Sequence, residues 1–201
     1  MKKLIALLVI LMPMSLFSQN MDIDILKSIH SPEPLPSDDF FRFMSNSNVY
    51  VYVGTPVTMA VVGLVGHDND LLRNAAEMAA GTAVAYGVTL GLKYTVKRER
   101  PFLTYPDEIV NKSGIDWSDS YSFPSGHSTM AFATATALLL EYPKWYVIVP
   151  SYAYAGTVAY SRMHLGVHYP SDVLTGAIIG SGCAVLSHYV NKKLQSNSKR
   201  H

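Results

Sequence analysis

Residues 161–173 read S-R-M-H-L-G-V-H-Y-P-S-D-V and join two apolar runs, residues 145–160 and 173–190. Both runs are expected to be helices, so this polar stretch connects them. His168 and Asp172 are four residues apart and therefore share a face on a helix or a helical turn. An aspartate that accepts the Nδ1 proton of an imidazole fixes its tautomer and leaves Nε2 free to attack. The connection thus carries a candidate nucleophile and a group that orients it.

Two further blocks supply cations and a second histidine: K-x6-R-P at residues 93–101 and P-S-G-H at residues 124–127. A phosphoryl group in transfer spreads negative charge over its equatorial oxygens, so catalysis is mainly positioning and charge stabilisation. Arginine suits this task because its planar fork binds two oxygens and stays protonated. Ser125 and Gly126 precede an apolar helical run, where backbone N–H groups point at an anion. The remaining groups are two arginine forks, one lysine point charge and a histidine that can protonate a leaving oxygen: Arg100, Arg162, Lys93 and His127.

These blocks resemble the type 2 phosphatidic acid phosphatase superfamily, which includes bacterial non-specific acid phosphatases, glucose-6-phosphatase and vanadium haloperoxidases. The resemblance runs from about Asp38 to about Val190 and shows no departure in the blocks. It implies hydrolysis without a metal or another cofactor. It also implies a general acid, His127, and a nucleophile, His168, that forms a phosphohistidine and is partnered by Asp172. The residues implied to bind phosphate are Lys93, Arg100, Ser125, Gly126 and Arg162, with Ser125 and Gly126 using hydroxyl and backbone N–H groups.

Other polar residues have simpler interpretations. His164 and His168 have a spacing that metal ligands also use, but the pattern lacks the zinc-protease glutamate and Asp172 is better explained as an orienting group. Lys97 and Arg98 are interpreted as a solvated or headgroup-facing rim. The remaining histidines are taken as packed or surface residues: His30, His67, His188 and His201.

Composition indicates one domain that is more apolar than an ordinary soluble protein. The chain has 201 residues, 15% of them charged, and a formal net charge of +1, with a mean hydropathy of +0.15. A near-zero charge without an extended basic face argues against nucleic acid as a partner. The sequence leaves the oligomeric state open.

The ends of the chain differ from its middle. Residues 1–19 are expected to be an export signal or N-terminal anchor, because two lysines precede a short apolar run. Residues 20–48 are expected to be a polar outer segment, with closely spaced prolines that disfavour a helix and one short helix around residues 39–42. Residues 49–191 are expected to form the helical domain, followed by a basic tail at 192–201.

The fold is expected to be an all-α bundle of about five apolar helices, or six if the N-terminal segment is retained, embedded in a membrane. The alternative is the buried helical core of a soluble enzyme. Gly87/Gly91 and Gly176/Gly180 form G-x3-G pairs, which let helices approach closely in a bilayer. The five apolar segments are residues 49–66, 72–92, 128–140, 145–160 and 173–190.

Alternation of these helices across a membrane gathers the motifs on one side. If residues 21–48 lie outside, then residues 93–127 and 161–172 also lie outside, and the lysines near both termini lie inside, as the positive-inside rule expects. This arrangement favours a cell-envelope membrane with the site facing the periplasm or exterior.

A site at the outer surface of a membrane suits a phosphorylated lipid, whose tails stay in the bilayer. The candidates are phosphorylated lipid A, undecaprenyl pyrophosphate, phosphatidylglycerol phosphate and phosphatidic acid, with selectivity shaped by the 102–123 loop. Three alternatives share parts of the pattern: a soluble periplasmic acid phosphatase, a vanadium-dependent haloperoxidase and a non-enzymatic membrane binding protein.

Overall fold

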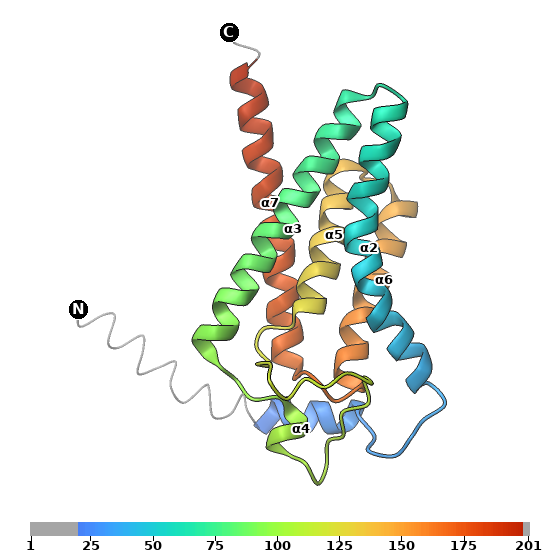
Figure 1. The fold of residues 1–201 in the computed structure, drawn as a ribbon, viewed down its shortest axis with the longest axis vertical. Coiled ribbons are helices and arrows are strands. Elements are labelled where there is room, and N and C mark those ends of the chain that lie inside the picture. The colour runs from blue at the N-terminus through green and yellow to red at the C-terminus, as the bar shows by residue number, and fades with distance from the viewer. Residues whose placement is uncertain (1–19, 199–201) are drawn as a thin grey trace, which may run out of the picture.

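The computed structural model describes residues 20–198, and within this range it contains helices and no strand. The labelled helices are α2 (Asp38–Val65), α3 (Asn69–Val96), the short α4 (Pro101–Thr104), α5 (Gly126–Glu141), α6 (Trp145–His164) and α7 (Pro170–Ser198). The five long helices run alternately up and down along one direction (Figure 1). The predicted all-α bundle of five helices is confirmed. The expected export signal lies outside the described residues.

The bundle places small side chains inside and large apolar side chains outside. Its buried hydrophobic residues include many alanines, such as Ala85, Ala135 and Ala155, whereas Leu174 and Ile178 are more than 60% exposed. Helix α2 and the Pro170–Leu194 part of α7 are long and apolar enough to cross a membrane, yet only 17% and 28% of their most apolar windows are buried. This distribution favours a helical bundle packed in lipid over the core of a soluble enzyme.

Helices α5 and α7 approach closely along one of the two predicted glycine pairs. A Cβ on Gly180 of α7 would collide with the backbone carbonyl of Thr129 on α5, and a Cβ on Gly176 would collide with the carbonyl of Ser125. Gly87 and Gly91 have open space at the Cβ position, so the prediction of close packing was wrong for that pair. The packing at Gly176 and Gly180 fixes the start of α7 against the start of α5, where two of the three motif blocks lie.

Residues 20–48 contain more helix than expected for the polar outer segment. Residues 20–29 are helical and lie across the end of the bundle (Figure 1), because Ile23 and Leu26 are buried against Ile109 and Tyr169. The short helix expected near residue 40 is the first part of α2, which begins at Asp38. The prolines interrupt helix only between these two segments, as their fixed backbone torsion and missing N–H predict.

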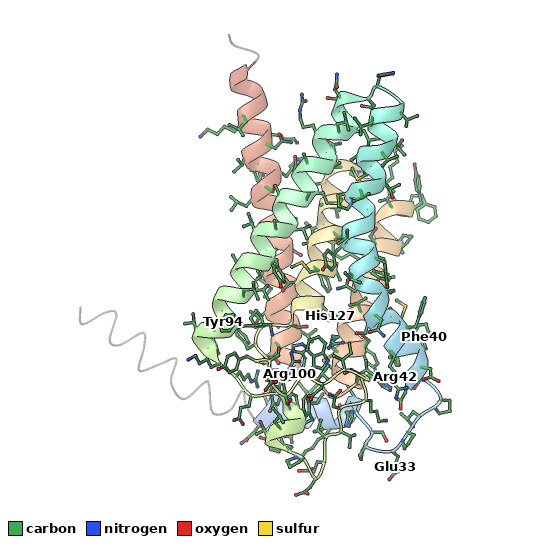
Figure 2. The ribbon with its side chains drawn as sticks, viewed as in Figure 1. Glu33, Phe40, Arg42, Tyr94, Arg100 and His127 are labelled. Carbon is green, nitrogen blue, oxygen red and sulfur yellow. The ribbon has the colours of Figure 1, made fainter. Side chains whose placement is uncertain are left out.

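The four chain segments that carry motifs meet at one end of the bundle. They are the end of α3, the start of α5, the end of α6 and the start of α7, and Figure 2 places Arg100 and His127 near one another at this end. The opposite end holds the α2–α3 turn and the α5–α6 turn (Figure 1). The described helices therefore alternate in direction, which gathers the motifs at one end of the bundle as inferred from sequence.

Candidate active site

A cavity of about 340 Å³ lies at the motif-bearing end, between α2, α3, α5 and the loop that precedes α5. Ser125 and Asp172 are fully buried behind its wall. The cavity is lined by six of the eight residues predicted for the site: Lys93, Arg100, Gly126, His127, Arg162 and His168.

His168 lies in the short connection between α6 and α7 and is 2% exposed. Its Nδ1 faces Asp172, 3.5 Å from Oδ2. Its Nε2 lies 3.3 Å from Nη1 of Arg100, on the cavity side. Burial, reinforced by the positive charges of Arg100, Arg162 and Lys93, holds the pKa of His168 well below its ordinary value. The imidazole is therefore neutral near pH 7, as a nitrogen nucleophile must be.

Asp172 is held from several directions in the first turn of α7. Its Oδ2 accepts hydrogen bonds from the backbone N–H of Tyr169, at 2.9 Å, and from the hydroxyl of Ser122. Its backbone carbonyl accepts from the N–H of Ser125, at 3.0 Å. These bonds fix the carboxylate beside the imidazole, although the Nδ1 to Oδ2 distance is longer than an ordinary hydrogen bond.

The guanidinium of Arg100 lines the cavity and is held in place by hydrogen bonds to backbone carbonyls. Its Nε donates to the carbonyl of Ser120 and its Nη1 to the carbonyl of Val167, both at 2.8 Å. The ring of Trp117 lies 4.9 Å from Cζ. Burial lowers the pKa of Arg100 to about 10, so the group still carries its charge at neutral pH.

Arg162 offers buried hydrogen-bond donors that suit an anion. Its side chain is buried and its Nη1 donates to the hydroxyl of Ser45. Its Nε and Nη2 have no hydrogen-bond partner among the described residues. A buried charged donor without a partner is costly. Because Arg162 also lines the cavity beside His168, an anion with several oxygen acceptors would satisfy these donors.

In the P-S-G-H block, Ser125 is buried, whereas Gly126 and His127 line the cavity. The Ser125 hydroxyl accepts hydrogen bonds from the backbone N–H and the hydroxyl of Ser128, at 3.5 and 3.1 Å, and so caps α5. Since its own N–H is bonded to Asp172, the contact of Ser125 with phosphate stays a prediction. Gly126 and His127 line the cavity, and the His127 ring lies edge-on to Trp117.

Lys93 reaches the cavity from the last turn of α3, where its Nζ donates to the carbonyl of Tyr121. This contact ties the point charge to the loop over the cavity. The loop also contributes Trp117, whose ring lies 5.5 Å from Cζ of Arg162. Its aromatic residues were expected only to shape selectivity, but Trp117 is also the surface against which both arginine forks lie.

Arg98 was wrongly interpreted as part of a solvated rim; Lys97 is exposed as expected. Arg98 is only 23% exposed, and its Nη1 bonds Oδ1 of Asp172 at 2.8 Å. His164 is also accounted for, because its Nε2 lies 2.7 Å from Asp38 Oδ1. The only sequence signal for a role of Arg98 was its position inside the K-x6-R-P block, two residues before Arg100.

The sequence of this chain is similar to those of known phosphatases. An undecaprenyl-diphosphatase of Sulfolobus acidocaldarius is 30% identical over 141 residues, covering 68% of this chain and 62% of that protein. A decaprenylphosphoryl-5-phosphoribose phosphatase of Mycobacterium tuberculosis is 37% identical over 125 residues, covering 60% and 63%. Each match therefore spans just under two thirds of the relative's length.

The fold has solved counterparts. The first transmembrane PAP2 type phosphatidylglycerolphosphate phosphatase from Bacillus subtilis superposes with a TM-score of 0.68 at 23% identity, over 88% of this chain and 87% of that one. At this identity the likeness concerns the fold. Residues 74–196 match the PAP2 superfamily, and this range contains all eight residues predicted for the site. The chain belongs to the PAP2 superfamily.

Proposed function

We propose that this protein is a metal-independent lipid phosphatase that hydrolyses a phosphomonoester or pyrophosphate through a phosphohistidine. The observation that carries the proposal is the pair of buried donors on Arg162 that have no partner among residues 20–198, beside a neutral His168. Together with Arg100 and Lys93, these donors form a pocket for a tetrahedral anion with a nucleophile at its edge.

In the first step, Nε2 of His168 forms a bond to phosphorus as the bond to the leaving oxygen breaks. Asp172 stabilises the imidazolium character that develops at Nδ1. His127 donates a proton to the leaving oxygen. A bound phosphate offsets the positive charge around His127 and so favours its protonated form.

In the second step, His127 takes a proton from water, and the resulting hydroxide attacks the phosphohistidine. The N–P bond breaks, inorganic phosphate leaves and His168 is restored. The charge on the equatorial oxygens in both steps is stabilised by Lys93, Arg100, Arg162 and the N–H of Gly126.

An apolar groove next to the phosphate cavity supports the proposal that the substrate is a lipid. The groove is lined by α2, α3 and Met130, has a volume of about 560 Å³ and shares Tyr52, Tyr86 and Met130 with the phosphate cavity. A phosphate in the cavity would thus have an apolar surface within reach for its tail. We propose that the site faces the periplasm or exterior of a cell-envelope membrane, in line with the positive-inside distribution of lysines.

The test is phosphate release by detergent-solubilised enzyme on four lipids: phosphorylated lipid A, undecaprenyl pyrophosphate, phosphatidylglycerol phosphate and phosphatidic acid. We expect turnover of at least one lipid and weaker turnover of a short soluble phosphomonoester. Preference for the soluble ester, with activity in the soluble fraction, would instead indicate an acid phosphatase. Peroxide-driven bromination with vanadate would indicate a haloperoxidase, and no chemistry at all would indicate a binding protein.

A further inference from the structure

We infer that Arg98 and Asp22 are positioning residues of the reaction, which hold Asp172 and, through it, His168. The inference rests on the proposed roles of His168 and Asp172. It makes the helical segment at residues 20–29, which lies outside the three motif blocks and the PAP2 match, a working part of the active site.

The two ends of the Arg98 fork contact carboxylates from opposite ends of the chain. Its Nη1 lies 2.8 Å from Asp172 Oδ1, and its Nη2 lies 2.7 Å from Asp22 Oδ2. The guanidinium also lies over the ring of Tyr169, with Cζ 3.8 Å from the centroid. An arginine held by two carboxylates and an aromatic ring leaves its two acidic partners little freedom.

Asp22 anchors this arrangement from the other side. It is 5% exposed. Its Oδ1 accepts from the backbone N–H of Ser171 at 2.8 Å, and its Oδ2 accepts from the Ser171 hydroxyl. Ser171 directly precedes Asp172 and also accepts a hydrogen bond from Arg98 Nη1 at 2.7 Å. Asp22 therefore fixes the first turn of α7, from which the Asp172 carboxylate projects.

This arrangement gives the two oxygens of Asp172 separate partners. Oδ1 is bonded to Arg98, while Oδ2 faces His168 and accepts from Tyr169 and Ser122. Without Arg98, the buried carboxylate would lose its counter-ion and could turn or become protonated. Either change would remove the acceptor that sets the His168 tautomer.

The expected effect is on the chemical step rather than on substrate binding. Arg98 and Asp22 do not line the phosphate cavity, so the phosphate contacts of Arg100 and Arg162 should persist. In metal enzymes, losing the outer partner of a ligating histidine changes affinity or activity about 10- to 100-fold, and we expect that range here. Arg98→Met should lower kcat about 10- to 100-fold and leave KM within about twofold.

The test combines single variants with a double-mutant cycle. Arg98→Met, Asp22→Asn and Asp172→Asn are compared alone, and the first two are repeated in the Asp172→Asn background. Arg98→Lys, which keeps the charge, should recover part of the kcat lost in Arg98→Met. If Arg98 and Asp22 act through Asp172, their changes should cost little further activity once Asp172 is replaced.

Lys27→Met is the matched control. Lys27 lies on the same helical segment and forms an ion pair with Glu108 at 2.5 Å, away from Asp172. This variant should retain the wild-type kcat. Equal losses in Lys27→Met and Asp22→Asn would overturn the inference, because they would show only that the segment must be docked.

The remaining outcomes separate the inference from the proposed function. Wild-type kcat in Arg98→Met or in Asp22→Asn, or full additivity with Asp172→Asn, would overturn the positioning role. Wild-type turnover in Asp172→Asn alone would contradict the proposed mechanism itself. If Arg98→Met fails to fold, Asp22→Asn carries the test, because asparagine keeps the size of the side chain and can still accept from Ser171.

Discussion

Replacing Arg162 by methionine removes a buried guanidinium whose Nε and Nη2 have no partner within the described residues. In the complex, we expect both groups to donate to phosphate oxygens. A hydrogen bond to a charged group contributes about 1.5–3 kcal/mol. Two such bonds contribute about 3–6 kcal/mol, which corresponds to a loss of about two to four powers of ten in kcat/KM. Arg162→Lys, which keeps one charge without the fork, should lose less.

The assay pairs kinetics with thermal unfolding. Vanadate at about 100 times its Kd should stabilise the wild type by about 2.7 kcal/mol, and this stabilisation should be largely lost in Arg162→Met. Without ligand, the variant should melt no lower than wild type, because buried unpaired donors oppose folding. Arg73→Met is the control, since Arg73 is half-exposed near the opposite end of α3. Unchanged kcat/KM and unchanged vanadate stabilisation in Arg162→Met would refute the assignment of Arg162 to phosphate.

Three further predictions address the acid, the metal and the packing. His127→Ala should lose more rate on a lipid phosphate than on an activated aryl phosphate, because a good leaving group departs without a proton; equal losses would indicate a binding role. Activity should survive EDTA because the positive side chains of Lys93, Arg100 and Arg162 stabilise the charge that a metal ion stabilises in other enzymes. Phosphate release that requires added magnesium would contradict this. Gly180→Ala should lower unfolding stability by about 1–3 kcal/mol through overpacking against Thr129. Gly182→Ala, with open space at its Cβ, is the control in chemical denaturation, and equal stability of the two variants would contradict the packing.

Much of the fold could be predicted because the helices are continuous apolar runs. The predicted runs 145–160 and 173–190 correspond to α6 and α7, although α6 ends at His164 and α7 extends from Pro170 to Ser198. The gathering of motifs followed from alternation alone, since every second connection of an up-and-down bundle lies at the same end. Gly176 and Gly180 also had a recognisable spacing, but Gly87 and Gly91 have the same spacing and different packing. The G-x3-G spacing alone does not show whether the face of the helix that carries the glycines packs against a neighbouring helix.

The supporting contacts of the site could not be predicted from local sequence. Arg98 follows α3 and contacts Asp22 and Asp172, which lie more than 70 residues away on either side. Such pairings depend on where the segment at residues 20–29 docks. That segment was assigned to a polar outer segment because of the acidic residues and prolines of residues 21–48, although Ile23 and Leu26, three residues apart, pack in one buried cluster with Ile109 and Tyr169.

The most direct test of the central claim is to trap the covalent intermediate. The enzyme is mixed with a lipid substrate carrying labelled phosphate, denatured within milliseconds and kept at alkaline pH, and the labelled peptide is identified by mass spectrometry. We predict label on His168, absent from His168→Ala, which should also lack turnover because no other side chain in the cavity replaces the nucleophile. Turnover by His168→Ala near the wild-type rate, or label on another residue, would contradict the account.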